Sequence, residues 1–108
     1  MLPPVDSERL DGRCAVVTGA GRGIGERIAL ELDALGAAVA VLDIDEEAAR
    51  RSAAGLARGL AVACDIGDEA SVRTAFAAIR RDLGTVDILV NNAGIVSMTP
   101  FLRSWAAA

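Results

Sequence analysis

Short apolar runs alternate along the chain with longer segments whose apolar residues recur at helical spacing. The runs predict four strands, at residues 14–18, 38–43, 60–64 and 86–90. The first run, CAVVT, does not alternate with polar residues, which is typical of a strand covered on both faces.

The three segments between these runs predict amphipathic helices. Gly36 ends the first, whose apolar stripe consists of Ile24, Ile28, Leu32 and Leu35. Asp45 is placed to cap the second helix, which is rich in alanine. Asp68 caps the third and Gly84 ends it, with an apolar stripe of Val72, Phe76, Ile79 and Leu83.

This alternation of strands and helices defines the fold class. The order βαβαβαβ predicts an α/β protein with a Rossmann-like, doubly wound parallel sheet. We expect a partial version of that fold, with four strands in the order 3-2-1-4 and three helices.

Composition and charge exclude several classes of partner. The 108 residues suffice for one small domain, and a net charge of −4 spread along the chain argues against a nucleic-acid-binding face. Cys14 and Cys64 lack the spacing of a metal site, so we expect a reduced, buried pair. The longest apolar run, residues 34–42, is too short to span a bilayer, and the N-terminus has no signal-peptide core. We therefore expect a soluble, cytoplasmic protein that binds no membrane.

Glycines gather where the first predicted strand passes into the first predicted helix. Residues 16–25 read VVTGAGRGIG, with Gly19, Gly23 and Gly25 on the turn. Without Cβ atoms the chain can turn sharply, and a diphosphate can approach the N–H groups at the helix start, where Arg22 could add a contact. The competing interpretation is an ordinary glycine-rich connection, but the position between strand and helix favours a cofactor.

An acidic residue stands where the second predicted strand ends. Asp43 can accept hydrogen bonds from both hydroxyls of an adenosine ribose and would repel a 2′-phosphate, which favours NAD over NADP. Arg22 is the counter-argument, because it could reach toward such a phosphate. Two alternatives remain: Asp43 as a simple turn residue, and an S-adenosylmethionine site of the methyltransferase type.

Two motifs together resemble the short-chain dehydrogenase/reductase family. TGAGRGIG at residues 18–25 has the family's TGxxxGxG pattern, and NNAG at 91–94 follows the fourth predicted strand. LDGRCAVVTG at 10–19 and CDIGD at 64–68 are also similar to that family. The resemblance implies an NAD(P)-dependent oxidoreductase that transfers a hydride between a nicotinamide cofactor and an alcohol or ketone.

The resemblance also implies which residues bind the cofactor. Asp65 would bond the adenine amino group with support from the Ile66 backbone, and Asn91 and Asn92 would lie along the adenosine side. Each of these polar side chains could instead satisfy only its local backbone. No metal ligands are expected. The full expected set is Gly19, Gly21, Arg22, Gly23, Ile24, Gly25, Asp43, Ile44, Asp65, Ile66, Asn91, Asn92, Ala93 and Gly94.

The proton-transfer chemistry of that family rests on residues that this chain lacks. The resemblance implies a Tyr-x-x-x-Lys pair and a Ser beyond NNAG, whereas the chain contains no Tyr, no Lys and no His. Ser97, Thr99 and Ser104 have no partner that would activate their hydroxyls. We therefore expect the chain to bind a dinucleotide without catalysing a reaction.

These expectations divide the chain into three parts. They are a lead-in at residues 1–12, an NAD(P)-binding Rossmann segment at 13–94 and a truncated substrate-side tail at 95–108. The alternative is a stand-alone, non-catalytic module that binds NAD or another nucleotide. An uncovered fourth strand would leave an apolar edge, so we also expect self-association through that edge.

Overall fold

The computed structural model describes residues 9–93. Gly94 of the expected cofactor set, the three hydroxyl residues Ser97, Thr99 and Ser104, and the whole expected tail lie outside the described residues. The elements in chain order are β1 (Cys14–Thr18), α1 (Gly23–Ala34), β2 (Ala38–Asp43), α2 (Glu46–Ala54), β3 (Gly59–Ala63), α3 (Glu69–Asp82) and β4 (Ile88–Asn91).

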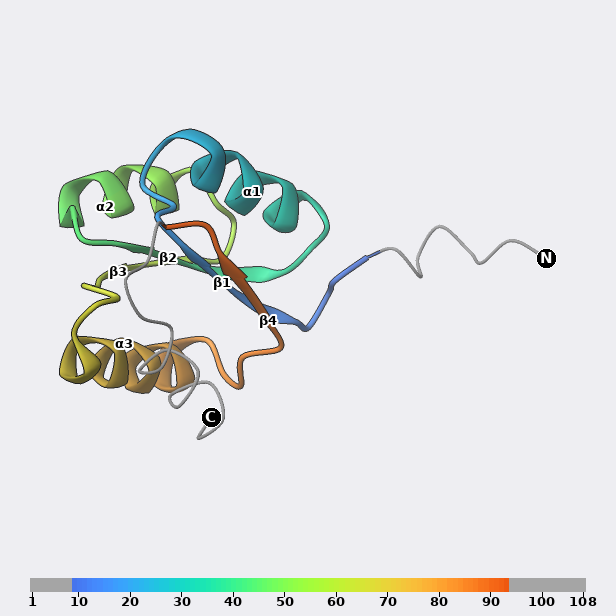
Figure 1. The fold of residues 1–108 in the computed structure, drawn as a ribbon. Coiled ribbons are helices and arrows are strands. Elements are labelled where there is room, and N and C mark those ends of the chain that lie inside the picture. Colours follow the sequence, from blue (N-terminus) through green and yellow to red (C-terminus); the bar gives the residue numbers. More distant parts are fainter. Residues whose placement is uncertain (1–8, 94–108) are drawn as a thin grey trace.

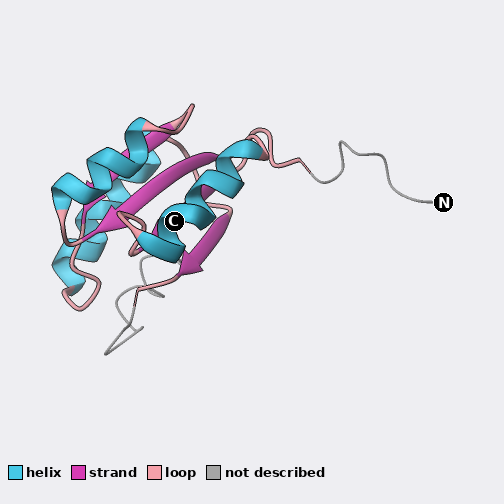
Figure 2. Ribbon diagram, turned by 90° about the horizontal axis from the view of Figure 1, so that it is seen from above, coloured by secondary structure: helices cyan, strands magenta, loops and turns pink. Residues whose placement is uncertain are grey.

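The four strands form one parallel sheet in the order β3-β2-β1-β4, as predicted. Helices α1 and α2 cover one face of the sheet and α3 covers the other (Figure 1). Figure 2 shows the same layers from above. The predicted Rossmann-like, doubly wound architecture is therefore confirmed for the described part of the chain.

Alternate residues of the two central strands supply two separate cores. Ala15 and Val17 of β1 pack with α1 and α2, whereas Cys14 and Val16 pack with α3. All four side chains are buried, because helices lie on both faces of the sheet. This is the packing that an apolar run without polar alternation predicts.

The bounds of β1 and β2 agree with the prediction, but those of the two outer strands do not. β3 lies one residue earlier than predicted, so Cys64 follows the strand instead of ending it. β4 begins at Ile88, two residues later than predicted, and continues to Asn91. Strand ends are defined by hydrogen bonding, which apolar patterning does not specify to the residue.

The predicted apolar stripe of α1 is partly wrong. Ile24 is 73% exposed and Leu35 is 38% exposed, while the buried residues of this helix are Gly25 and Ala29. The helix approaches the sheet through these two small residues, and the stripe residues Ile28 and Leu32 pack at the edge of the core.

Helices α2 and α3 begin after their predicted caps, and α3 ends shortly before Gly84 as predicted. The side chain of Asp45 accepts a hydrogen bond from the backbone N–H of Ala48, and that of Asp68 accepts one from Ala70. Gly84 has a φ of +109°, which lets the chain leave α3 without strain. Local capping chemistry is thus sufficient to define both helix starts.

Among residues 9–93, β4 pairs with β1 and has no strand on its other side. The expected self-association through this edge stays a prediction. Within the same residues, no helix combines the length and the apolar character that crossing a membrane requires.

Candidate functional site

The carboxyl ends of all four strands meet at one edge of the parallel sheet. The chain runs from β1 outward to β2 and β3 and then returns to place β4 on the other side of β1. Thr18, Asp43, Ala63 and Asn91 are the last residues of their strands; Thr18 pairs with Asn91 and Asp43 with Ala63, and Asp43 lies one residue beyond Leu42, the partner of Thr18. Ligands bind open α/β sheets at such a reversal of strand order.

Two glycines of the turn after β1 adopt conformations that other residues rarely take. Gly19 has a φ of +61° and Gly23 a φ of +63°. A Cβ on Gly23 would meet nothing within 4 Å, so this backbone faces open space. The turn therefore presents bare main chain at the start of α1.

The other two glycines of the turn are buried and serve packing. A Cβ on Gly25 would lie 2.3 Å from the carbonyl oxygen of Gly19, so only glycine allows α1 to approach β1 this closely. A Cβ on Gly21 would lie 2.7 Å from the Cβ of Ala48 in α2. Gly21, which was expected to contact the cofactor, is thus placed against α2.

Helix α1 differs from α2 and α3 at its N-terminus. Its N-cap residue, Arg22, makes no side-chain capping bond, whereas Asp45 and Asp68 cap the other two described helices. Within residues 9–93, the first backbone N–H groups of α1 therefore receive no capping side chain, beside the open space at Gly23. This arrangement favours an anion.

Thr18 joins the glycine turn to the segment after β4. Its hydroxyl donates to Asn91 Oδ1 at 2.9 Å and accepts from the backbone N–H groups of Asn92 at 3.0 Å and Ala93 at 3.1 Å. The side-chain nitrogen of Asn92, Nδ2, also donates to the carbonyl oxygen of Gly19 at 3.3 Å. The asparagines thus connect the end of β4 to the glycine turn at the edge of the site, and their contact with a cofactor stays a prediction.

Asp43 binds the backbone on both sides of the site. Its Oδ2 accepts a hydrogen bond from Gly21 N at 3.0 Å, and its Oδ1 accepts one from Asp45 N at 2.9 Å. A carboxylate has further lone pairs, so these bonds leave Asp43 able to accept from a ligand. The turn role and the ligand role are therefore compatible.

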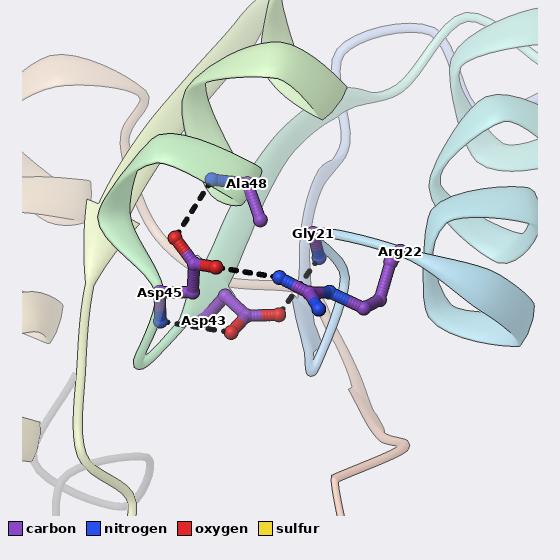
Figure 3. Close-up of polar contacts among 5 residues, drawn as sticks. All are labelled: Gly21, Arg22, Asp43, Asp45 and Ala48. Carbon is purple, nitrogen blue, oxygen red and sulfur yellow. Dashed lines mark hydrogen bonds and ion pairs between the residues drawn. The ribbon is translucent and has the colours of Figure 1, made fainter.

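Arg22 is paired with Asp45 across the gap between the glycine turn and α2. The guanidinium Nη2 lies 2.5 Å from Asp45 Oδ2, and Asp45 Oδ1 accepts from Ala48 N (Figure 3). The Ala48 N–H, and then the charge of Arg22, hold the pKa of Asp45 below its ordinary value. Arg22, which could add a contact to the phosphates, is paired with Asp45 in this structure, and its contact with a cofactor stays a prediction.

A cavity of about 220 Å³ opens between the ends of β1, β2 and β3. Asp65 lies on its wall, and its Oδ1 accepts from Gly67 N at 3.0 Å, which is the local role considered for it. Ile44 is 74% exposed at the same edge and lines the cavity. The cavity is lined by Gly19, Leu42, Asp43, Ile44, Cys64, Asp65, Ile66 and Ala93.

Both cysteines are buried and carry free thiols, as expected from their spacing. Burial raises the pKa of the Cys14 thiol, with a smaller contribution from Asp87 in the same direction. Burial also raises the pKa of Cys64, on the cavity wall, although Ser71 opposes the change. Both thiols are therefore protonated and poorly nucleophilic at neutral pH.

The raised pKa values of the two thiols predict a loss of folding stability in alkaline solution. When a thiol has a higher pKa in the folded state than in the unfolded state, folding is fully stabilised at pH values below the unfolded-state pKa. That stabilisation decreases as the pH rises from the unfolded-state pKa toward the folded-state pKa. We expect the free energy of unfolding in urea to fall above about pH 8.5. The chain has no Lys or Tyr, so few other groups titrate there. The Cys14→Ala/Cys64→Ala variant should lose this alkaline decline; an unchanged decline would contradict the assignment.

The structure brings together most of the expected residues and adds three that the sequence did not indicate. Thr18 was treated only as the end of a strand, although a hydroxyl ending an apolar run was a usable signal. Asp45 was recognised as a helix cap but not as the partner of Arg22. Cys64 was placed inside β3 instead of on the cavity wall.

The sheet topology, the bare glycine turn and the acidic residue that ends β2 define a Rossmann-like α/β domain. Comparison with known proteins agrees: residues 13–107 match the short chain dehydrogenase family. The chain belongs to that family, whose cofactor is a nicotinamide dinucleotide.

Individual relatives show how much of the family's length is present. The chain is 45% identical over 98 residues to D-threitol dehydrogenase of Mycolicibacterium smegmatis, covering 85% of this chain and 37% of that protein. It is 42% identical over 100 residues to 7alpha-hydroxysteroid dehydrogenase of Escherichia coli K12, covering 89% of this chain and 39% of that protein. The chain thus spans well under half the length of these curated relatives.

Solved structures give the same picture. A 7 alpha-hydroxysteroid dehydrogenase in complex with NADH and 7-oxo glycochenodeoxycholic acid is similar with a TM-score of 0.83 and 38% identity, covering 95% of this chain and 45% of that chain. A 3-ketoacyl-(acyl-carrier-protein) reductase from Brucella melitensis in complex with NADH is similar with a TM-score of 0.76 and 42% identity. The match covers 86% of this chain and 43% of that chain.

Proposed function

We propose that this chain is the cofactor-binding part of an NAD-dependent oxidoreductase that interconverts alcohols and ketones. The observation that carries the proposal is the uncapped start of α1, with Gly23 facing open space, beside a cavity lined by Asp43. A Cβ-free backbone with unshared N–H groups fits a diphosphate, and a carboxylate at the end of β2 fits a ribose.

Each part of the site has a role in this proposal. The N–H groups at the start of α1 bind the diphosphate, and Asp43 accepts from the ribose hydroxyls. The cavity beside Asp65 and Ile66 takes the adenine end, because 220 Å³ is below the roughly 300–1,000 Å³ of pockets that enclose a whole drug-sized ligand. When bound, the nicotinamide ring supplies or accepts the hydride.

The chain by itself is expected to bind and not to turn over. Neither Tyr nor Lys occurs in its 108 residues, so the proton donor implied by the family resemblance has no counterpart here. Purified chain mixed with NADH and a set of ketones should show no steady loss of NADH absorbance.

We further propose a cytoplasmic location, since two free buried thiols fit a reducing compartment.

The proposal predicts a cofactor-selective effect of Asp43→Ala. Charge-assisted hydrogen bonds contribute about 1.5–3 kcal/mol each, so NADH should bind about 10- to 100-fold more weakly for each ribose hydrogen bond that is lost. NADPH should lose less affinity, because the variant also removes a negative charge that opposes its 2′-phosphate. Isothermal titration calorimetry of both cofactors measures the two affinities.

The comparison of the two cofactors is the internal control. Asp43 also binds Gly21 N, so a merely loosened turn would weaken NADH and NADPH alike. Equal losses would therefore show that Asp43 acts on the turn and not on the ribose. Wild-type chain that binds S-adenosylmethionine but not NAD would refute the proposed cofactor altogether.

A further inference from the structure

The glycine turn contains a single basic residue, and the structure shows it already engaged. Arg22 lies between Gly21 and Gly23, and its guanidinium is paired with Asp45. Asp45 is itself held in place, because its Oδ1 accepts from Ala48 N and its N–H donates to Asp43 Oδ1. The cation is thus fixed on the α2 side of the turn, next to the carboxylate proposed for the ribose.

We propose that Asp45 is a specificity-determining positioning residue that excludes a 2′-phosphate by holding Arg22 against α2. The inference rests on the proposed function, because it concerns the adenosine ribose of the same dinucleotide. Asp43 opposes a 2′-phosphate by its own charge, whereas Asp45 acts by withholding Arg22, the cation of the glycine turn, which could attract it (Figure 3).

The local charges support these separate roles of Asp43 and Asp45. Two carboxylates and one guanidinium meet at the end of β2, which leaves a net negative charge where the ribose would lie. A phosphate monoester carries a charge of roughly −1.5 to −2 at pH 7 and is repelled there. Without the Asp45 charge, Arg22 would balance Asp43 and could donate to the phosphate.

The ion pair can be removed without unfolding the chain. The Arg22 and Asp45 side chains are 67% and 44% exposed, and exposed pairs contribute little to stability. Asn is as good an N-cap as Asp, so Asp45→Asn keeps an oxygen for Ala48 N and removes only the charge. This substitution therefore isolates the effect on Arg22.

The test compares adenosine 5′-monophosphate with adenosine 2′,5′-bisphosphate, which differ only in the 2′-phosphate. Calorimetry on the 108-residue chain at fixed ionic strength gives the ratio of the two affinities. We expect Asp45→Asn to shift this ratio toward the bisphosphate by about fivefold. Arg22→Gln should change the ratio little in the wild type and should abolish the gain in the Asp45→Asn background.

Asp68→Asn is the matched control. Asp68 caps α3 as Asp45 caps α2, and the described residues place no arginine within ion-pair distance of it. Its substitution should leave the ratio unchanged, and an equal shift in both variants would overturn the inference by showing a general charge effect.

The remaining outcomes separate the two proposals. Monophosphate binding with an unchanged ratio in Asp45→Asn would overturn the role of Asp45 and leave the proposed function standing. A large loss of bisphosphate affinity in Arg22→Gln alone would also overturn it, because Arg22 would then already reach the phosphate. Failure of both ligands to bind the wild type would refute the proposed function and, with it, this inference.

Discussion

Replacing Gly25 with alanine should destabilise the chain by about 3 kcal/mol, a large part of the stability of a small domain. The added Cβ would lie 2.3 Å from the Gly19 carbonyl oxygen and 2.7 Å from the Asn92 amide nitrogen. The first of these contacts is with main chain, so α1 must move away from β1. Urea unfolding measures the loss, and dinucleotide affinity should fall with it because the helix start is displaced.

Gly23→Ala is the matched comparison, because the same methyl enters open space. We expect this variant to lose about 1–2 kcal/mol in the free energy of unfolding, because alanine is strained in the left-handed conformation of Gly23. Under the proposed function its effect on dinucleotide affinity should nevertheless be large, since the methyl lies beside the N–H groups at the start of α1. If Gly25→Ala were no more destabilising than Gly23→Ala, the close approach of α1 to β1 would be refuted.

Thr18→Val should be the second large effect, with a loss of about 2–3 kcal/mol in the free energy of unfolding. The variant has nearly the same shape but removes the acceptor of the Asn92 and Ala93 backbone N–H groups and the donor to Asn91. Backbone donors left without a partner in a partly buried position are expensive. The measurement is again urea unfolding, combined with dinucleotide titration.

Thr18→Ser separates the hydroxyl from the methyl group. It keeps all three hydrogen bonds and loses one buried methyl, so we expect a cost of about 1 kcal/mol and little change in dinucleotide affinity. If Thr18→Val cost no more than Thr18→Ser, Thr18 would contribute through its methyl packing instead of its hydroxyl, and the link between the glycine turn and the end of β4 would be unsupported.

Much of the fold could be predicted because its determinants are local. The unbroken apolar runs specify β1 and β2, and Asp45 and Asp68 specify two helix starts through a single side-chain bond each. The strand order follows from the alternation of elements and the family resemblance. The positions of the site residues at one sheet edge follow from the parallel topology.

The errors arose where several parts of the chain meet. The exposure of Ile24 depends on how closely α1 approaches the sheet, which is decided by Gly25 and Gly19 and not by helical periodicity. The pairing of Arg22 with Asp45 joins residues 23 positions apart, and charge type alone does not indicate it. Tertiary contacts of this kind are invisible to propensity and pattern.

The hydroxyl of Thr18 has a consequence for the order in which the domain assembles. Its three partners lie 73 to 75 positions further along the chain, so none of them is present when the first strand, turn and helix have formed. Closing so long a loop is entropically unfavourable until the last strand docks on the sheet. An intermediate built from the first three strands would contain every glycine of the turn and still lack its anchor. Under the proposed function, dinucleotide affinity should therefore depend on completion of the sheet, because the hydroxyl of Thr18 has its three partners only once β4 has docked.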